Sequence, residues 1–230
     1  SYYKNLSVLF LDKWFKYIDA YKSNQTGKIQ EILNSNSGKT AIVVGDGVSW
    51  EFSKDIISNI HNKSYKLSSN YIFAGLPSET EHNMSQLYVA TGEVLPTKKK
   101  RENYLVKTNE DKSIDFIDLE NVNETTDAAH YLICSYKDPD KLGETYQQKA
   151  LKYFDDVAKT FAAKIQQLLQ NGYKNVYLVT DHGYTLTGIL ENSDKIEVNF
   201  SGMVDKSERF IRSENQQQID ADLLIGKEIK

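Results

Sequence analysis

The chain has 230 residues, of which 40% are hydrophobic and 26% are charged. This composition is ordinary for a soluble globular chain and too apolar for a disordered one. Its 28 basic and 32 acidic residues leave a net charge of −4, which argues against a protein that holds nucleic acid mainly through its overall field. Apolar runs reach only a handful of residues, whereas a membrane-spanning helix needs about 20. We therefore expect no membrane partner.

A single cysteine, Cys134, excludes a disulfide framework within the chain and fits a reducing compartment. The chain begins at Ser1 without a methionine or a secretory leader, and it ends at Lys230 in a polar, charged run. We expect both ends to be cut edges of a longer natural protein, the alternative being tag removal and a natural terminus. The length predicts one large domain, or one domain with an appendage.

The first predicted element is helical. Apolar residues recur at helical spacing from Asn5 to about Leu33, with a break near Ser23–Thr26, which predicts one long helix or two shorter ones. We assign residues 1–36 to this helical segment, either as the end of a preceding region or as part of the domain that follows. That domain spans residues 37–230, and we expect it to be truncated at its C-terminus.

Four short apolar runs then predict strands buried on both faces, as in a parallel sheet covered by helices. They lie at residues 40–44, 71–75, 131–134 and 176–179. Helical patterns lie between or after these runs, over residues 50–60, 78–92 and 145–169, and extra strands are predicted at 104–106, 114–119, 196–200 and 209–211. This alternation predicts an α/β fold, a three-layer sandwich with a mainly parallel central sheet.

Polar side chains follow the predicted strands, at the edge where parallel sheets bind ligands. Carboxylates and an imidazole gathered in one crevice repel each other or stay unsatisfied unless they bind a cation, and Asp and His ligands suit Zn²⁺ or Mn²⁺. Singly, each residue has a plainer explanation as a turn, loop or packed residue. Recurrence at successive strand ends favours the cation site. The candidates are Asp46, Ser78, Thr80, Asp138, Asp140, Glu144, Asp181 and His182.

The segment around Thr80 predicts a helix N-terminus. Ser78 and Glu81 have the spacing of a capping box, which places Thr80 in the first turn, where backbone N–H groups and the helix dipole favour anions. A hydroxyl beside a metal there could attack phosphorus, and Asn83, one turn further on, could donate to a phosphoryl oxygen. The alternative is a capped helix with a solvent-facing threonine.

Four segments in this order resemble a known family. They are residues 43–47 (Val-Val-Gly-Asp-Gly), 76–80 (Leu-Pro-Ser-Glu-Thr), 140–144 (Asp-Lys-Leu-Gly-Glu) and 179–183 (Val-Thr-Asp-His-Gly). Together they resemble the alkaline phosphatase superfamily, and most closely its PglZ domain branch. The resemblance covers roughly Lys39 to Arg212, and its specific parts are the Thr-Asp-His-Gly and Pro-Ser-x-Thr segments. It implies an alkaline-phosphatase-like α/β fold.

The resemblance also implies roles for individual residues. Asp46, Thr80, Asp181 and His182 match the ligands of one metal site, with Thr80 as the nucleophile of a two-step phosphoryl transfer. Asn83 matches an asparagine found in the nucleotide pyrophosphatase relatives. The implied protein is a phosphatase or phosphodiesterase that uses one or two Zn²⁺ or Mn²⁺ ions.

The second metal site of the family is incomplete in this chain. Asp140 matches its aspartate, but Glu144 stands where most of the superfamily has histidine, and no histidine follows His182. Either the missing ligand lies in a C-terminal portion outside this chain, or the domain binds one metal.

The resemblance implies a phosphoester substrate, nucleotide-derived esters included, and a cytoplasmic role in bacterial phage-defence or signalling proteins. The alternative is a non-catalytic interaction module that keeps the fold and docks to other defence proteins, which the incomplete second site favours. A Rossmann-type nucleotide domain is disfavoured because no Gly-x-Gly-x-x-Gly follows the first strand. The cationic run Lys98–Arg101 fits either an attraction for phosphorylated substrates or, as the more common case, a solvated loop.

Overall fold

The computed structural model describes residues 2–62, 64–127, 129–146, 150–184, 201–206 and 210–215. The chain divides into two compact units, one formed by Ser1–Lys22 with Ile189–Lys230 and the other by Ser23–Gly188. The first unit contains α1 (Tyr2–Tyr17), the short 3-10 helix η1 (Ile18–Ala20) and an antiparallel pair of strands, β5 (Met203–Lys206) and β6 (Ile211–Ser213). All of the predicted site residues belong to the second unit.

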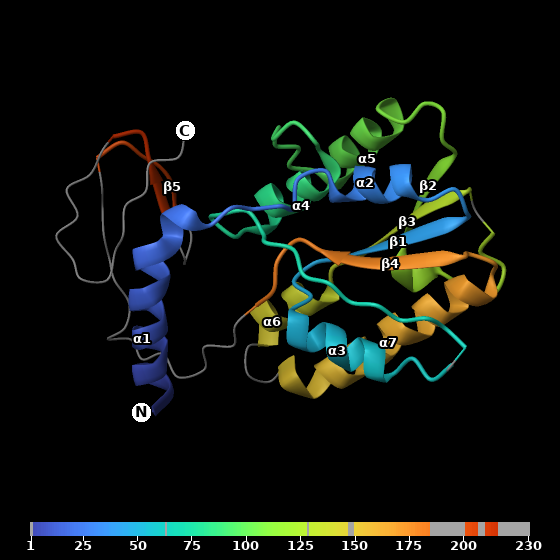
Figure 1. Ribbon diagram of the computed structural model, residues 1–230, viewed down its shortest axis with the longest axis horizontal. Helices are drawn as coiled ribbons and strands as arrows, with labels where there is room; N and C mark the ends of the chain where they lie inside the picture. The colour runs from blue at the N-terminus through green and yellow to red at the C-terminus, as the bar shows by residue number, and fades with distance from the viewer. Residues whose placement is uncertain are drawn as a thin grey trace. The chain divides into compact units, whose positions relative to one another are not determined.

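The second unit is built on a parallel sheet of four strands in the order β2-β3-β1-β4 (Figure 1). Gly45, the last residue of β1, is in register with Tyr136 of β3 and Thr180 of β4. The carboxyl ends of these three strands therefore lie level with one another, and the residues that follow them meet at one edge of the sheet. The strands are β1 (Thr40–Gly45), β2 (Ile114–Asp118), β3 (Tyr131–Tyr136) and β4 (Asn175–Thr180).

Helices cover both faces of this sheet (Figure 1). Ala41 and Val43 of β1 pack with the helices of one face, and Ile42 and Val44 pack with those of the other. Because alternate residues of a strand point to opposite faces, this central strand is buried on both sides, as its continuously apolar sequence predicts. One face carries α3 (Trp50–Ser58), α6 (Asp138–Tyr146) and α7 (Leu151–Gln170); the other carries α2 (Lys28–Ser35), α4 (Thr80–Tyr88) and α5 (Lys98–Lys107).

This arrangement confirms the predicted α/β class with a parallel central sheet flanked by helices. It also confirms the predicted break between the first helices, since residues 21–27 separate η1 from α2. The helix predicted at 145–169 corresponds to α7, whereas α6 was not predicted as a helix, and the strand predicted at 196–200 lies outside the described residues. Of the helices in the described parts of the chain, none has both the length and the apolarity to cross a membrane.

The strand predicted at residues 71–75 is wrong. This segment is extended but does not join the sheet; it pairs instead with the chain just before α2. The backbone N–H of Asn24 donates to the carbonyl of Phe73 (3.1 Å), and the N–H of Phe73 donates to Oδ1 of Asn24 (2.7 Å). Tyr71 is 64% exposed and Phe73 is 46% exposed, so the apolar run is not the core of a buried strand.

The strand predicted at 104–106 is also wrong, because these residues belong to α5. The helix begins after Thr97, whose hydroxyl accepts from the N–H of Lys100, and it buries Leu105 completely against the sheet. Three apolar residues do not distinguish a strand from one turn of a helix. The cationic run is thus the first turn of this helix rather than a solvated loop: Lys98 pairs with Asp118 at 2.6 Å, and Arg101 is buried.

Candidate metal centre

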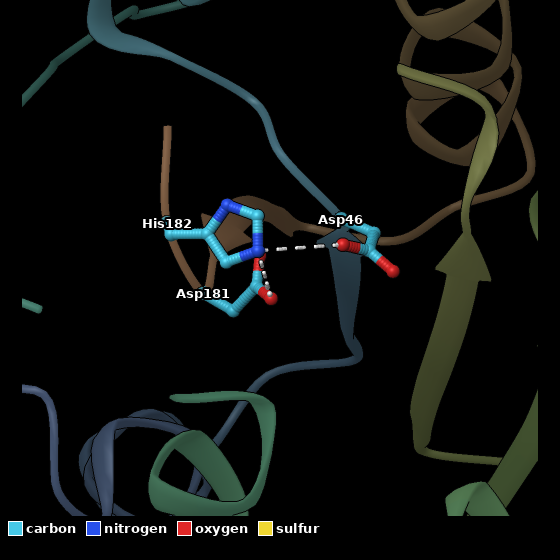
Figure 2. A group of neighbouring side chains, drawn as sticks. All are labelled: Asp46, Asp181 and His182. Carbon is cyan, nitrogen blue, oxygen red and sulfur yellow. Dashed lines mark ion pairs between the residues drawn. The ribbon is translucent and has the colours of Figure 1, made fainter. Parts of the chain in front are cut away.

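Asp46 comes directly after β1, and Asp181 and His182 come directly after β4. Because β1 and β4 pair in parallel with their ends level, the three side chains converge at the same edge of the sheet (Figure 2). Nε2 of His182 lies 3.3 Å from Oδ2 of Asp181 and 3.8 Å from Oδ1 of Asp46. One potential ligand atom from each of the three residues lies within 4.8 Å of the others.

The group is buried and strongly acidic. Asp46 is 6% exposed, Asp181 is 0% exposed and His182 is 4% exposed. Burial raises the pKa of Asp46 to about 7, and repulsion from Asp181 and Asp140 adds to the effect, while His182 and the Thr80 hydroxyl oppose it. Burial raises the pKa of Asp181 as well. Two buried carboxylates this close together are costly to ionise unless a cation joins them.

The hydrogen bond of the His182 ring fixes which nitrogen faces the carboxylates. Nδ1 lies 2.9 Å from the backbone carbonyl of Gly183. A carbonyl only accepts, so Nδ1 carries a hydrogen, and the ring in its neutral form presents the lone pair of Nε2 to the acidic group. Histidines that bind metals commonly donate their second nitrogen to a carbonyl in this way. The ring is therefore oriented as a ligand would be.

One oxygen of Asp181 lacks a donor. Oδ1 accepts from the backbone N–H of Gly47 at 3.1 Å, whereas Oδ2 is buried and has no hydrogen-bond partner among the described residues. This Oδ2 is the atom 3.3 Å from Nε2 of His182, so two acceptor atoms face each other. A buried acceptor without a donor is costly, and a cation between the two atoms satisfies both. The residues thus fit a divalent metal of the Zn²⁺ or Mn²⁺ type.

A further polar contact holds the two ligand loops together. The Thr180 hydroxyl donates to the backbone carbonyl of His182 at 2.8 Å and accepts from the N–H of Val48 at 3.1 Å. The loop after β1 and the loop after β4 are therefore joined by Thr180 as well as by the Gly47–Asp181 bond. Thr180 was not among the residues predicted for the site. Its place directly before Asp181 and His182 could have indicated this role.

Thr80 is the first residue of α4, and its hydroxyl lies inside the acidic group. Oγ1 is 2.9 Å from Nε2 of His182 and 3.3 Å from Oδ1 of Asp46. The predicted capping box is wrong: the N-cap is Glu79, and within the described chain no side chain caps this helix end. Backbone N–H groups of the first turn therefore stay uncapped beside the Thr80 hydroxyl, where they favour an anion.

Asp140 lies close to the group but outside it. A Cβ atom on Gly47 would stand 2.9 Å from Cβ and 3.1 Å from Oδ1 of Asp140, so this carboxylate packs against the loop that carries Asp46. Asp138 and Glu144 lie in α6, and their side chains are outside the described residues.

Asn83 occupies a different place from the one its predicted role suggests. Its side chain is fully buried, and its amide donates to the carbonyl of Gly75 (3.3 Å) and to the hydroxyl of Ser78 (3.4 Å). These bonds tie the start of α4 to the segment before it. In this state Asn83 contributes to the position of the helix rather than to the acidic group.

No protein-family model matches this chain, and a search of curated proteins finds no match either. What the structure defines is an α/β unit with a parallel sheet whose carboxyl edge holds a buried Asp-Asp-His group and a threonine hydroxyl.

Proposed function

We propose that this chain is a metal-dependent phosphatase or phosphodiesterase domain with an alkaline-phosphatase-like fold, similar to PglZ domains, in which Thr80 is the nucleophile. The observation that carries the proposal is the position of the Thr80 hydroxyl, 2.9 Å from His182 and 3.3 Å from Asp46 at an uncapped helix end. A nucleophile, a set of metal ligands and an anion-binding helix terminus are the parts that phosphoryl transfer requires.

Asp46, Asp181 and His182 would hold the ion, with the Thr80 oxygen beside them. A bound Zn²⁺ or Mn²⁺ supplies Lewis acidity, which lowers the pKa of a nearby hydroxyl and offsets charge on phosphoryl oxygens. One ion is supported by the three buried ligands. Asp140 would belong to a second ion, with Glu144 in place of the usual histidine. With a single ion, we expect slow turnover or a restriction to activated diesters.

The chain's own residues would act in two steps. In the first, Oγ1 of Thr80 forms a bond to phosphorus, its proton passes to the Asp46 carboxylate oxygen that does not hold the ion or to water, and the ester oxygen leaves with the bonding electrons. The first turn of α4 would hold the phosphoryl oxygens through backbone N–H groups. In the second step, water attacks the phosphothreonine, which releases phosphate or a monoester and restores the hydroxyl.

We further propose a cytoplasmic bacterial setting, with a phosphoester substrate, nucleotide-derived esters included, and with phage-defence or signalling proteins as partners. These proposals rest on the resemblance of residues 43–47, 76–80, 140–144 and 179–183 to PglZ domains.

The test is hydrolysis of a chromogenic phosphodiester by the protein loaded with Zn²⁺ or Mn²⁺. Thr80→Ala and Asp181→Ala should each abolish turnover, while Thr108→Ala should not, since that hydroxyl caps the far end of α5 by donating to Tyr104. Hydrolysis that survives both site variants would refute the mechanism. Metal binding without turnover, together with co-purifying partners, would instead favour the non-catalytic interaction module.

A further inference from the structure

Gln25 is a fully buried polar residue outside the region of family resemblance. It lies in the segment 21–27 between η1 and α2, where the sequence predicts only a break between helices, and its side chain is 0% exposed. A side-chain amide removed from water must find partners for both its donor and its acceptor. The partners of the Gln25 side chain are 50 to 156 positions away, and they lie at the end of β4, directly after it, and in the segment before α4.

The amide of Gln25 joins two segments. Its nitrogen donates to the backbone carbonyl of Asp181 and, at 3.5 Å, to that of Thr180. Its oxygen accepts from the backbone N–H of Gly75 at 3.2 Å. Carbonyls only accept and an N–H only donates, so the partners fix which end of the amide is nitrogen and which is oxygen.

Both segments lead directly to groups of the site. Asp181 is itself one of the three clustered residues, and its backbone leads into His182. On the other side, the carbonyl of Gly75 accepts from Asn83 in α4, the helix that begins with Thr80. Gln25 is thus the link between the loop of the ligands and the segment that enters the nucleophile helix.

The surrounding segment is held in the same way. The N–H of Gly27 donates to the carbonyl of Gln86 near the end of α4 (2.8 Å), and the Ser23 hydroxyl donates to the carbonyl of Phe73 (2.9 Å). Gly27 adopts a φ of 71°, in the left-handed region that favours glycine, and serves as the N-cap of α2. The chain before α2 is therefore hydrogen-bonded both to α4 and to the segment that precedes α4. These bonds fix the backbone that carries the Gln25 side chain.

We infer that Gln25 is a positioning residue: its amide holds the Asp181–His182 loop against the segment before α4, and so sets the distance between the metal ligands and the Thr80 hydroxyl. This inference rests on the proposed function. Outer hydrogen-bond partners of metal sites typically change metal affinity by about 10–100-fold when removed. A shape-retaining residue without the amide should therefore weaken metal binding without unfolding the chain.

The experiment compares Gln25→Met with Gln30→Met by Zn²⁺ titration of the whole chain, at a temperature where both remain folded. Gln30 is the matched control because its side-chain amide also both donates and accepts, away from the metal centre. Its nitrogen donates to the Thr108 hydroxyl (2.7 Å), and its oxygen accepts from the Asn109 amide (2.9 Å). We expect about 10-fold or weaker Zn²⁺ binding for Gln25→Met and wild-type binding for Gln30→Met. Amide hydrogen exchange should also accelerate at Gly75 in the first variant alone.

A second variant isolates the donor. In Gln25→Glu, the carboxylate still accepts from Gly75 but faces the carbonyls of Thr180 and Asp181 without a hydrogen to offer, so Zn²⁺ binding should fall at least as far as in Gln25→Met. Wild-type Zn²⁺ affinity in both variants would overturn the inference and leave the proposed function standing. Unfolding of both variants would also overturn it, since the role would then be purely structural. Failure of the wild-type chain to bind both Zn²⁺ and Mn²⁺ would remove the proposed function itself.

Discussion

The hydroxyl of Thr80 lies 2.9 Å from Nε2 of His182, although the two residues are 102 positions apart in the chain. The contact joins the first turn of α4 to the loop after β4. Nδ1 of His182 faces the carbonyl of Gly183, so Nε2 is the ring nitrogen that faces the Thr80 hydroxyl, and this hydroxyl also donates to Oδ1 of Asp46 at 3.3 Å. Thr80 is therefore half-buried with its hydroxyl turned toward the acidic group, and it is not the solvent-facing residue of the alternative interpretation.

Replacing Thr80 tests whether its oxygen forms a covalent intermediate. Thr80→Val keeps the shape of the side chain and removes the oxygen, so hydrolysis of a phosphodiester should fall by at least about 10³-fold. Thr80→Ser keeps the oxygen and should retain measurable turnover. Intact-protein mass spectrometry after rapid mixing with substrate should detect a phosphorylated enzyme in the wild type and in Thr80→Ser. A phosphorylated adduct in Thr80→Val would place the nucleophile elsewhere.

Asp181→Asn should separate metal binding from folding. Asparagine can still accept from Gly47 through its oxygen, while the variant removes a buried charge whose second oxygen lacks a donor among the described residues. We expect the metal-free variant to be as stable as the wild type or more stable by about 1–3 kcal/mol. The wild type should gain about 2.7 kcal/mol at a metal concentration of about 100 times Kd, and the variant should gain nothing.

Asp115→Asn is the matched control for that measurement. The Asp115 carboxylate also accepts from a backbone N–H, that of Ala129 at 3.0 Å, but it is exposed and lies on β2, away from the acidic group. Its replacement should leave the metal-dependent gain in stability unchanged, as followed by chemical denaturation with and without Zn²⁺. An equal loss of the gain in both variants would contradict a specific role for Asp181.

The raised pKa of Asp46 predicts how the metal-free protein responds to pH. The group titrates near 7 when folded, against an ordinary value of 3.8. Between these values the folded chain holds a proton that the unfolded chain has released, so the free energy of unfolding should fall as pH rises from about 4 to about 7. The fall should be on the order of 2–4 kcal/mol. Denaturant titrations across this range measure it, and Asp46→Asn should flatten the profile.

Bound metal should reverse this dependence. A proton and a metal ion compete for the Asp46 carboxylate, so metal affinity should rise as pH increases toward about 7 and above. In saturating Zn²⁺, the wild type should consequently gain stability over the range in which the metal-free protein loses it. The same negative slope with and without Zn²⁺ would show that no ion joins Asp46 and Asp181.

Much of this fold could be predicted because its strands are locally distinctive. Residues 40–44, 131–134 and 176–179 are continuously apolar, and each lies in a strand of the parallel sheet. Parallel strands end at the same edge, so the side chains of Asp46, Asp181 and His182 could be expected to meet there, as they do. Neither step needed the register between the strands.

What could not be predicted depends on pairing between distant segments. The run 71–75 has the composition of a strand, but its backbone forms hydrogen bonds with residues before α2. The sequence around residues 71–75 does not indicate which distant segment it contacts. For the same reason nothing near Gln25 indicated its bonds, 155 and 156 positions away, to Thr180 and Asp181. The predicted capping box is wrong because α4 begins at Thr80 with Glu79 as its N-cap, one residue later than a Ser78 cap requires.

Gly47 should tolerate substitution poorly, because both its backbone conformation and its neighbours oppose an added Cβ atom. Its φ is 70°, and an added Cβ would lie 2.9 Å from Cβ and 3.2 Å from Cα of Asp140. Gly47→Ala must therefore strain the backbone and push α6 away from the loop of Asp46. Gly92→Ala provides the control, since Gly92 has a similar φ of 79° but an added Cβ there meets no described atom within 4 Å.

We expect Gly92→Ala to lower the free energy of unfolding by about 1 kcal/mol, the cost of the left-handed conformation alone, and Gly47→Ala to lower it by about 2–4 kcal/mol because the steric clash adds to that cost. Urea denaturation of the metal-free proteins measures both. Gly47→Ala should also weaken Zn²⁺ binding, because the N–H of Gly47 orients Asp181 through its 3.1 Å bond to Oδ1. Equal destabilisation by the two substitutions, with unchanged Zn²⁺ affinity, would mean that the contact between Asp140 and the Asp46 loop does not constrain the site.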